Sequence, residues 1–564
     1  RPFSGGIGGG GFMLIYLAKE NRHIVLDHQA MTSSAFGPES FMNPETGELY
    51  PEVVRASSGM SVAVPGAIKG WEQALEEFGT LTLAEVLQPA IDIAENGFVA
   101  NENFVREISE HVDRFRLFES TANIYLDENG NVPKPGTIIK NPDLAKTYRL
   151  VAEHGSRIFY EGDIADAIIR AVQQPPLVDD PDFTKVDDKW KQEYGILKGN
   201  ISKDDLKSYE TVLREPTKIS YHEYDVYGAP PVACGGVTVG VALNILEHYD
   251  LSKMPRTKAM HYYIEALKLA FADRSAYIGD ERHVNIPVNG LLSKPYAAVR
   301  KQMIEEDQAS KGQAVCGHPW PHQKGTDQKH PVGASANQEK NIVLSDDEDP
   351  NRPETSTIHT TVSDKDGNIV SFTNTILYIG GSGIVVPGYG FLLNNMLFRV
   401  VPVNESGHPD YPRPNMRPLS NMSPTIVMKN DKPVVALGSP GGETIMSTVL
   451  QTLINYLDFN MTLEEAISAP RLIQMNNEDG MTRFEEIFAN DYETQDSRNL
   501  LKELGEMGHA FTPDKKAHGV GSVTAIEFLP DHKVRAVGEP TRRGGGTAMV
   551  QYPTDKTSKR HIAE

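Results

Sequence analysis

The stretch Thr357-Ile-His-Thr-Thr-Val-Ser-Asp-Lys-Asp-Gly-Asn-Ile-Val-Ser-Phe-Thr-Asn-Thr-Ile376 decides the fold of this chain. Its two arms are rich in β-branched residues and alternate, which is the pattern of two half-buried strands. A loop of residues 365–367 with Gly367 in the left-handed conformation is typical of a three-residue β-hairpin. In that register Thr357 lies opposite Thr375, so two hydroxyls meet across the strands. A bulge would break the register.

The segment before the hairpin differs in kind. Residues 305–355 contain few apolar side chains and many Gly, His, Pro, Asp and Gln, including the acidic run Ser345–Pro350. This composition predicts a flexible, exposed linker that ends directly before Thr357. A precursor that cleaves itself needs a reachable cleavage point and a new chain end anchored in a sheet. Paired threonines are also common in strands for packing alone.

The chemistry of a self-cleaving precursor explains why a threonine would stand here. A threonine hydroxyl is a weak nucleophile that needs a base. If cleavage makes Thr357 a chain terminus, its own α-amine, with a pKa of about 7.7–8.0, takes the hydroxyl proton. In the precursor the same hydroxyl would attack the Ser356 carbonyl and give an ester that water hydrolyses. Thr375 would hydrogen-bond Thr357 and hold its rotamer.

A second candidate feature is a glycine turn after a short apolar run. Val434–Leu437 is followed by Gly438-Ser-Pro-Gly-Gly442 and a helical pattern over Glu443–Leu457. Backbone N–H groups at such a helix start are free to bind an anion. Gly441 and Gly442 are therefore candidate donors to the oxyanion of a tetrahedral intermediate. The alternative is a tight turn chosen for space.

The remaining pattern predicts a mixed fold with an antiparallel sheet and helices on its faces. Residues 174–200 are polar and resemble a surface insertion. Expected strands are Phe12–Leu17, His23–Leu26, Ser61–Val64 and Tyr224–Ala229, and expected helices are Ala67–Phe78, Leu83–Asn96, Val237–Asp250 and His261–Tyr277.

Composition and charge exclude several classes of function. The net charge of −21 disfavours nucleic acid and anionic membrane surfaces. No apolar run reaches the roughly 18 residues of a membrane-spanning helix. Two cysteines exclude a disulfide framework. A metal site is disfavoured because the candidate ligands are irregularly spaced. Gly6–Gly11 matches G-x-G-x-x-G but precedes a strand rather than a helix, so a dinucleotide-binding site is disfavoured too. The residues weighed for a metal are Cys316, His318, His322 and His330.

These pieces together resemble the γ-glutamyltranspeptidase family over almost the whole chain. The ordered motifs are Ser4–Leu14, Val64-Pro-Gly66, Gly70-Trp71, Leu87–Ile91, Asn96-Gly-Phe98, Pro230-Pro231 with Gly235-Gly236, Ala272-Asp-Arg-Ser-Ala-Tyr277, Thr357-Ile-His359, Asp364–Asn368, Leu392-Leu-Asn-Asn395, Arg417-Pro-Leu-Ser420, Met422-Ser-Pro-Thr425 and Gly438–Gly442. Each motif is weak alone, and the ordered set is specific.

The resemblance implies an α+β fold, namely the four-layer αββα sandwich of N-terminal-nucleophile hydrolases. It implies cleavage between Ser356 and Thr357 into a large chain, 1–356, and a small catalytic chain, 357–564. It implies no cofactor and transfer of a γ-glutamyl group from glutathione-type amides to water, an amino acid or a peptide. By resemblance the site holds the nucleophile Thr357, its partner Thr375, the oxyanion donors Gly441 and Gly442, and the substrate-binding Ser420 and Asn421.

Several head-group positions depart from the family pattern. Gln29 stands where the family has an arginine for the glutamyl α-carboxylate, and Leu377 replaces an asparagine. Arg399 replaces the acidic residue that holds the substrate α-amine, so an ammonium there would meet repulsion. An acyl group with a carboxylate but no α-amine would suit Arg399 better. Asn421 replaces a serine.

Three interpretations therefore stay open. One is a γ-glutamyl amidohydrolase and acyltransferase, the second a glutaryl- or cephalosporin-type acylase, and the third an uncleaved, non-catalytic relative. The family and the tripeptides at Asn200, Asn404, Asn421 and Asn460 favour the secretory pathway, although the sequence shows no signal peptide. The chain begins inside the glycine signature, without the helical segment that usually precedes it, which suggests a fragment or an unusual gene model.

Overall fold

Two large antiparallel sheets form the centre of the molecule in this computed structural model, which describes residues 2–178, 195–323, 355–400, 408–485, 495–514 and 520–551. In spatial order the first sheet consists of β5 (Val212–Arg214), β2 (Arg22–Asp27), β1 (Gly10–Leu17), β9 (Ile369–Tyr378) and β8 (Thr355–Ser363). The second consists of β16 (Lys533–Gly538), β15 (Thr524–Leu529), β11 (Lys432–Gly438), β10 (Thr425–Lys429), β7 (Tyr224–Gly228) and β6 (Thr217–Tyr221).

The two sheets pack against each other through one face each. Phe12 and Leu14 of β1 share a buried cluster with Ile426 of β10 and Ala436 of β11. A hydrogen bond also joins the sheets, since the Ser371 hydroxyl on β9 donates to the Leu437 carbonyl on β11 at 3.0 Å. Alternation along each strand leaves a second apolar face that helices must cover.

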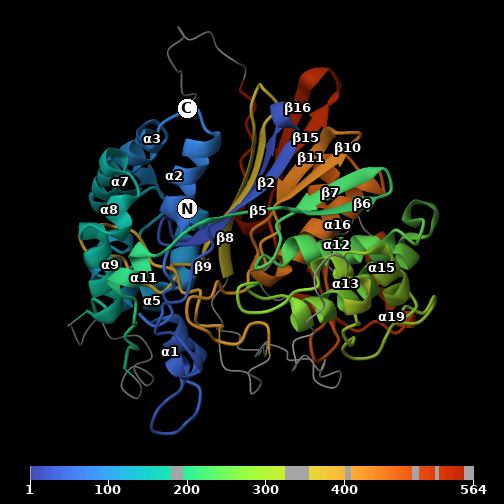
Figure 1. Ribbon diagram of the computed structural model, residues 1–564, viewed down its shortest axis with the longest axis horizontal. Helices are drawn as coiled ribbons and strands as arrows, with labels where there is room; N and C mark the ends of the chain where they lie inside the picture. Colours follow the sequence, from blue (N-terminus) through green and yellow to red (C-terminus); the bar gives the residue numbers. More distant parts are fainter. Residues whose placement is uncertain are drawn as a thin grey trace.

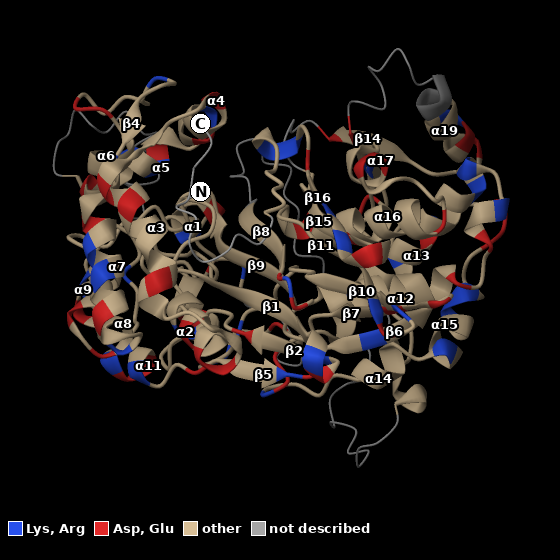
Figure 2. Ribbon diagram, turned by 90° about the horizontal axis from the view of Figure 1, so that it is seen from above, with Lys and Arg blue, Asp and Glu red and all other residues tan. Residues whose placement is uncertain are grey.

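Helices cover both outer faces, as Figures 1 and 2 show. On the first sheet, Met13 and Ile15 pack against Trp71 and Phe78 of α2 (Ala67–Phe78). The other helices on this side of the molecule are α1 (Glu52–Ala56), α3 (Leu83–Asn96), α4 (Glu102–Glu110), α5 (Val112–Leu117), α6 (Glu119–Tyr125), α7 (Pro142–His154), α8 (Arg157–Tyr160), α9 (Asp163–Gln173) and α11 (Lys203–Lys207).

On the second sheet, Val435 and Leu437 share the largest core cluster with α12 (Gly235–Leu246), α13 (Arg256–Tyr277) and α16 (Ile445–Leu457). The helix α12 is apolar on nearly every side, and α16 is buried over most of its length, because other elements surround both. The outer elements on this side are α14 (Val288–Leu291), α15 (Lys294–Lys301), α17 (Leu463–Ser468), α19 (Gln495–Glu506) and the small sheet of β12 (Leu472–Ile473), β13 (Thr482–Glu485) and β14 (Phe511–Asp514). A second small sheet, β3 (Phe98–Val99) with β4 (Ile138–Ile139), lies on the opposite side.

Most predicted elements are confirmed, and the mixed α and β class with them. Helices α2 and α3 have the predicted bounds, and the strands β1, β2 and β7 and the helices α12 and α13 lie over the predicted segments. One strand prediction was wrong: residues 61–64 form only an isolated bridge between Val64 and Met31. The reason is that the Asn394 side chain bonds both backbone groups of Ala63, so no strand partner is needed there.

The two predicted insertions lie partly outside the described residues. Of 174–200, residues 179–194 are not described, and of 305–355, residues 324–354 are not described. The first part of the second segment packs on the body of the molecule. Ala309 is buried, the Ala314 amide donates to Asn476 Oδ1 at 2.6 Å, and the Gly317 carbonyl accepts from the Tyr277 hydroxyl at 2.6 Å.

Candidate active site

The hairpin predicted from sequence is present, with one departure at its open end. Ser363 pairs with Ile369, and Gly367 has φ +87°, as a three-residue loop requires. The predicted register holds from Ile358 to Ser363 and then shifts, because Ser356 pairs with Leu377. Between these points β8 contributes one residue and β9 two, which is a β-bulge at Thr357.

The bulge brings the predicted hydroxyls together on one carbonyl group. The Thr375 hydroxyl donates to the Ser356 carbonyl oxygen at 2.5 Å, and Thr357 Oγ1 lies 2.6 Å from the same oxygen. The two hydroxyl oxygens are 3.2 Å apart. All three residues are buried. The carbonyl that precedes the predicted nucleophile is therefore polarised by two hydroxyls.

The backbone around the bulge orients the Thr375 hydroxyl. The Leu377 amide donates to Thr375 Oγ1 at 2.9 Å, which leaves the hydroxyl proton for the Ser356 carbonyl. Leu377 has φ +80°, a conformation that costs a β-carbon-bearing residue energy and that clusters at functional sites. On the other side, a β-carbon on Gly9 would lie 1.9 Å from the Thr375 carbonyl oxygen, so only glycine fits.

The glycine turn lies where β11 of the second sheet meets α16. Gly441 has φ +136° and Gly442 φ +57°, and a short 3₁₀ helix over Gly442–Thr444 leads into α16. Among the described residues, neither Gly441 nor Gly442 donates its amide in a hydrogen bond. Gly442 and Thr357 line the same cavity. The turn can therefore present free N–H groups to an anion near Thr357.

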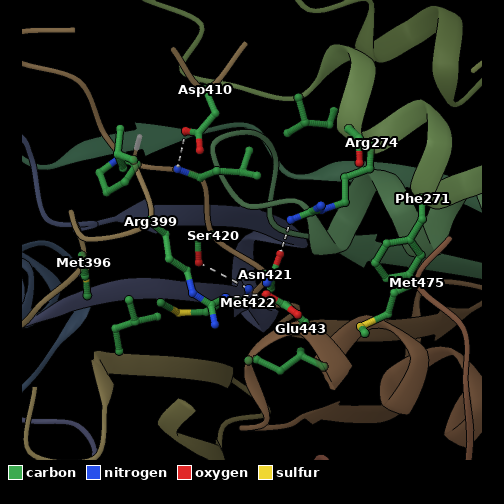
Figure 3. Close-up of a pocket in the computed structure, with 18 of the residues that line it drawn as sticks. Phe271, Arg274, Met396, Arg399, Asp410, Ser420, Asn421, Met422, Glu443 and Met475 are labelled. Carbon is green, nitrogen blue, oxygen red and sulfur yellow. Dashed lines mark hydrogen bonds and ion pairs between the residues drawn. The ribbon is translucent and has the colours of Figure 1, made fainter. Parts of the chain in front are cut away.

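A cavity of about 150 Å³ joins the predicted residues (Figure 3). Its lining includes eight that the sequence singled out: Gln29, Thr357, Thr375, Leu377, Arg399, Ser420, Asn421 and Gly442. Ser356 and Gly441 do not line it. Residues from both sides of the predicted cleavage point thus meet in one cavity.

Ser420 and Asn421 enter the cavity from the segment before β10. Ser420 is fixed by its backbone, whose amide donates to the Val232 carbonyl at 3.1 Å and whose carbonyl accepts from the Cys234 amide at 2.7 Å. The Asn421 side chain accepts a hydrogen bond from Arg274 Nη2 at 2.6 Å. Both positions therefore depend on the segment between β7 and α12 and on α13.

The charge at Arg399 differs from the expectation drawn from sequence. Arg399 lines the cavity, but its guanidinium forms an ion pair with Glu443, the residue after the glycine turn, and packs near the Phe398 and Tyr378 rings. Its positive charge is therefore compensated within the protein. The predicted repulsion of a substrate ammonium is weakened, because Glu443 supplies a negative charge beside it.

Gln29 lies buried in the cavity wall. Its amide nitrogen donates to the Pro418 carbonyl at 3.2 Å, and its Oε1 has no partner among the described residues. A neutral amide at this position cannot supply the charge of the arginine that the family pattern implies.

Three charged residues of the cavity were missed from sequence, namely Arg274, Asp410 and Glu443. Arg274 lies within the Ala272–Tyr277 motif, which could have indicated it. Burial raises the pKa of Asp410 to about 6, while the Leu419 amide and the nearby Arg274 and Arg413 oppose that rise. Asp410 therefore changes charge within the physiological range.

His359, two residues after Thr357, is not a base of this site. Its Nδ1 lies 2.8 Å from the Thr373 hydroxyl and its Nε2 3.0 Å from the Thr361 hydroxyl. Burial lowers the pKa of His359 to about 3, so the ring is neutral at physiological pH. The His359 ring links the hydroxyls of Thr373 and Thr361 and lies against Gly438.

Within the described parts of the chain, no cluster of three or more His, Cys, Asp or Glu side chains is placed to hold a metal ion. Over the same parts, no helix has the length and apolar character needed to cross a membrane.

Comparison with known proteins identifies the family to which the chain is similar. The family model described as "Gamma-glutamyltranspeptidase" matches residues 1–549. The glutathione hydrolase proenzyme of Bacillus subtilis (strain 168) is 33% identical over 97% of this chain and 85% of its own length. The acylase ACY 1 proenzyme of Pseudomonas sp. (strain SE83) is 31% identical over 98% of this chain and 88% of its own length.

Among solved structures, the cephalosporin acylase from Bacillus halodurans superposes with a TM-score of 0.76 at 24% identity, covering 98% of this chain and 89% of that one. This likeness supports the same fold. The resemblance drawn from the ordered motifs is confirmed by the family match over residues 1–549: the chain belongs to the γ-glutamyltranspeptidase family of N-terminal-nucleophile enzymes.

Proposed function

We propose that this protein is a self-processing amide hydrolase and acyltransferase that uses Thr357 as its nucleophile. The observation that carries the proposal is the pair of threonine hydroxyls, Thr357 and Thr375, on the Ser356 carbonyl oxygen. The two packed sheets with helices outside them fit the four-layer αββα sandwich of N-terminal-nucleophile hydrolases.

Maturation would begin with attack of Thr357 Oγ1 on the Ser356 carbonyl carbon. The carbonyl oxygen gains negative charge in this step and is stabilised by the Thr375 hydroxyl, which already donates to it. The C–N bond then breaks, and the Thr357 nitrogen receives the proton from the attacking hydroxyl. Water hydrolyses the resulting ester, which leaves a carboxylate on Ser356 and a free α-amine on Thr357.

Turnover would use the same hydroxyl with the new amine as its base. The amine accepts the Thr357 hydroxyl proton while Oγ1 attacks the acyl carbonyl of the substrate. Gly441 and Gly442 would donate to the oxyanion, and the amine would pass its proton to the leaving nitrogen. The acyl-enzyme on Thr357 then gives its acyl group to water, an amino acid or a peptide. No cofactor enters these steps.

The acyl group is proposed to be γ-glutamyl or a related acyl chain that carries a carboxylate. Ser420 and Asn421 line the cavity and would be available to either acyl group. A second candidate, a glutaryl- or cephalosporin-type acyl group without an α-amine, is favoured by Gln29 and Leu377, which replace residues expected around a zwitterionic head group. Arg399 replaces a third such residue, but its charge is paired with Glu443.

A comparison of matched anilides tests the proposal. Purified protein is given γ-glutamyl and glutaryl p-nitroanilide, and kcat/KM is measured for each. Hydrolysis of either one supports the proposed chemistry. A value for the γ-glutamyl anilide well above that for the glutaryl anilide would reject the acylase candidate. A protein that stays uncleaved and hydrolyses neither anilide would be the non-catalytic relative.

A further inference from the structure

The cavity contains four charged side chains, and the opposite charges of two of them compensate each other. Arg399 and Glu443 form an ion pair on one wall. The others are Arg274 on α13 and Asp410 on the segment before β10. Arg274 forms no ion pair with any carboxylate in the described part of the chain, although Asp410 lies near enough to affect its electrostatics. Arg274 is therefore the cation of the cavity whose charge no ion pair compensates.

Arg274 is held in an orientation that leaves donors for a ligand. Its Nη2 donates to Asn421 Oδ1 at 2.6 Å, and its guanidinium lies 5.8 Å from the centre of the Phe271 ring. Its Nε is buried and has no hydrogen-bond partner within the described residues. The thiol of Cys234 lies beside it. Figure 3 shows the side chain reaching from α13 towards Asn421.

We propose that Arg274 determines specificity by binding the carboxylate of the acyl group, with Asn421 positioning its guanidinium. The inference rests on the proposed function and names the anchor of the same site. A guanidinium presents paired N–H groups that match a carboxylate, and such charge-assisted bonds are about twice as strong as neutral ones. Gln29 supplies no charge, and Arg399 is already paired with Glu443.

A carboxylate is common to γ-glutamyl and glutaryl groups, so the inference holds for either acyl donor. They differ in the ammonium of the γ-glutamyl group. Glu443 is the carboxylate nearest to the glycine turn in sequence, and an ammonium bound to it would share the carboxylate with Arg399. Binding through Arg274 does not involve that pair.

The test is the ratio of kcat/KM for glutaryl p-nitroanilide to that for pentanoyl p-nitroanilide, which has the same chain length and no carboxylate. In Arg274→Gln the ratio should fall by roughly 100-fold, mainly through a higher KM, because one partner of a buried charge pair is lost. Arg274→Lys should restore part of the ratio, since it keeps the charge but not the fork. The γ-glutamyl anilide, measured beside them, shows whether the same holds for a zwitterionic acyl group.

Two further variants make the result specific. The double change Arg399→Gln with Glu443→Gln removes the neutral pair and should alter the ratio less than Arg274→Gln does. Arg22→Gln removes an exposed arginine at the start of β2 and serves as the control for a lost surface charge. If Arg274→Gln fails to fold, Asn421→Ala replaces it and should lower the ratio about tenfold.

An unchanged ratio in an active Arg274→Gln would overturn the inference and leave the proposed function standing. So would an equal loss on both anilides, which is the mark of a structural role. A larger fall in the Arg399 and Glu443 double variant would move the anchor to Arg399. A wild-type protein that is neither cleaved nor active would overturn the proposed function and, with it, the inference.

Discussion

Two threonine hydroxyls share the carbonyl oxygen of Ser356, and the oxygen of one of them, Thr375, also accepts a hydrogen bond from the Leu377 amide. The two hydroxyls therefore have different roles in the proposed cleavage. The Thr375 hydroxyl directs its proton to the carbonyl oxygen, whereas the Thr357 oxygen adjoins the same carbonyl group and is the proposed attacking atom. A residue that donates to a developing oxyanion contributes about 10²–10³ in rate.

Thr375→Val keeps the shape of the side chain and removes the donor, so self-cleavage should slow by about 10²–10³-fold. The rate is followed as loss of the full-length band on denaturing gels after a pulse of expression. Thr360→Val, on the exposed side of β8, is the matched control and should cleave at the wild-type rate. Cleavage of Thr375→Val at the wild-type rate would refute the role given to Thr375.

Asp410 gives the cavity a pH dependence. Burial raises the pKa of Asp410 to about 6, so the carboxyl is neutral below pH 6 and negative above it. The groups that face the carboxyl are Arg274, Arg413 and the Leu419 amide, while His408 Nδ1 accepts a hydrogen bond from the Asp410 backbone amide. Once ionised, Asp410 competes for Arg274 and repels an acyl carboxylate.

The ratio of kcat/KM for glutaryl to pentanoyl anilide should therefore fall by about threefold to tenfold as pH rises through about 6, an effect of roughly 1 kcal/mol. Taking the ratio cancels the titration of the Thr357 amine. Asp410→Asn should flatten the profile. A ratio that rises with pH, or a profile that the variant leaves unchanged, would contradict this account.

Sequence alone could indicate Thr357 and Thr375 because a short hairpin brings them together, and hairpin register follows from loop length. Arg274 could not be found in this way. It is separated by 147 positions from Asn421, and their contact depends on how α13 packs on the second sheet. The pairing of Arg399 with Glu443 was missed for the same reason.

Two irregular elements build the site: the bulge at Thr357 on the first sheet and the glycine turn that follows β11 on the second. The periodic elements were predictable, as the bounds of α2 and α3 show, because apolar spacing and end signals agree in them. The bulge was not, since it interrupts the alternation on which the register was based. The strand expected at residues 61–64 does not form, because the Asn394 side chain bonds the backbone N–H and C=O groups of Ala63.

The glycine turn gives a prediction at the scale of this element. A β-carbon on Gly441 would lie 2.7 Å from the Gly521 backbone, and φ is +136°, so Gly441→Ala must move the turn. We expect folded protein whose acyl turnover falls by at least about 10²-fold. Circular dichroism and kcat measure the two properties. Gly505→Ala, in α19 with open space around it, is the control and should keep full activity. Near-normal turnover in Gly441→Ala would exclude these amides as the oxyanion donors.

The predicted chains 1–356 and 357–564 are interleaved in both large sheets. In the first, β1 of the large chain pairs with β9 of the small chain, and in the second, β7 pairs with β10. The buried clusters that join the sheets also draw on both. Cleavage at Thr357 would therefore leave most of the core intact.

The two chains should accordingly stay together after cleavage. Processed protein should elute from a size-exclusion column as one species that contains both chains, and only denaturant should separate them. Independent elution of the small chain in native buffer would contradict the shared-sheet arrangement.

The central claim, that this member of the γ-glutamyltranspeptidase family activates itself at Thr357, has a direct measurement. Wild-type protein and Thr357→Ala are run on a denaturing gel, and the smaller band is sequenced from its N-terminus. The account predicts two bands in the wild type, the smaller beginning at Thr357, and one full-length band in the variant. A single uncleaved band in both, or a small chain that begins elsewhere, would contradict it.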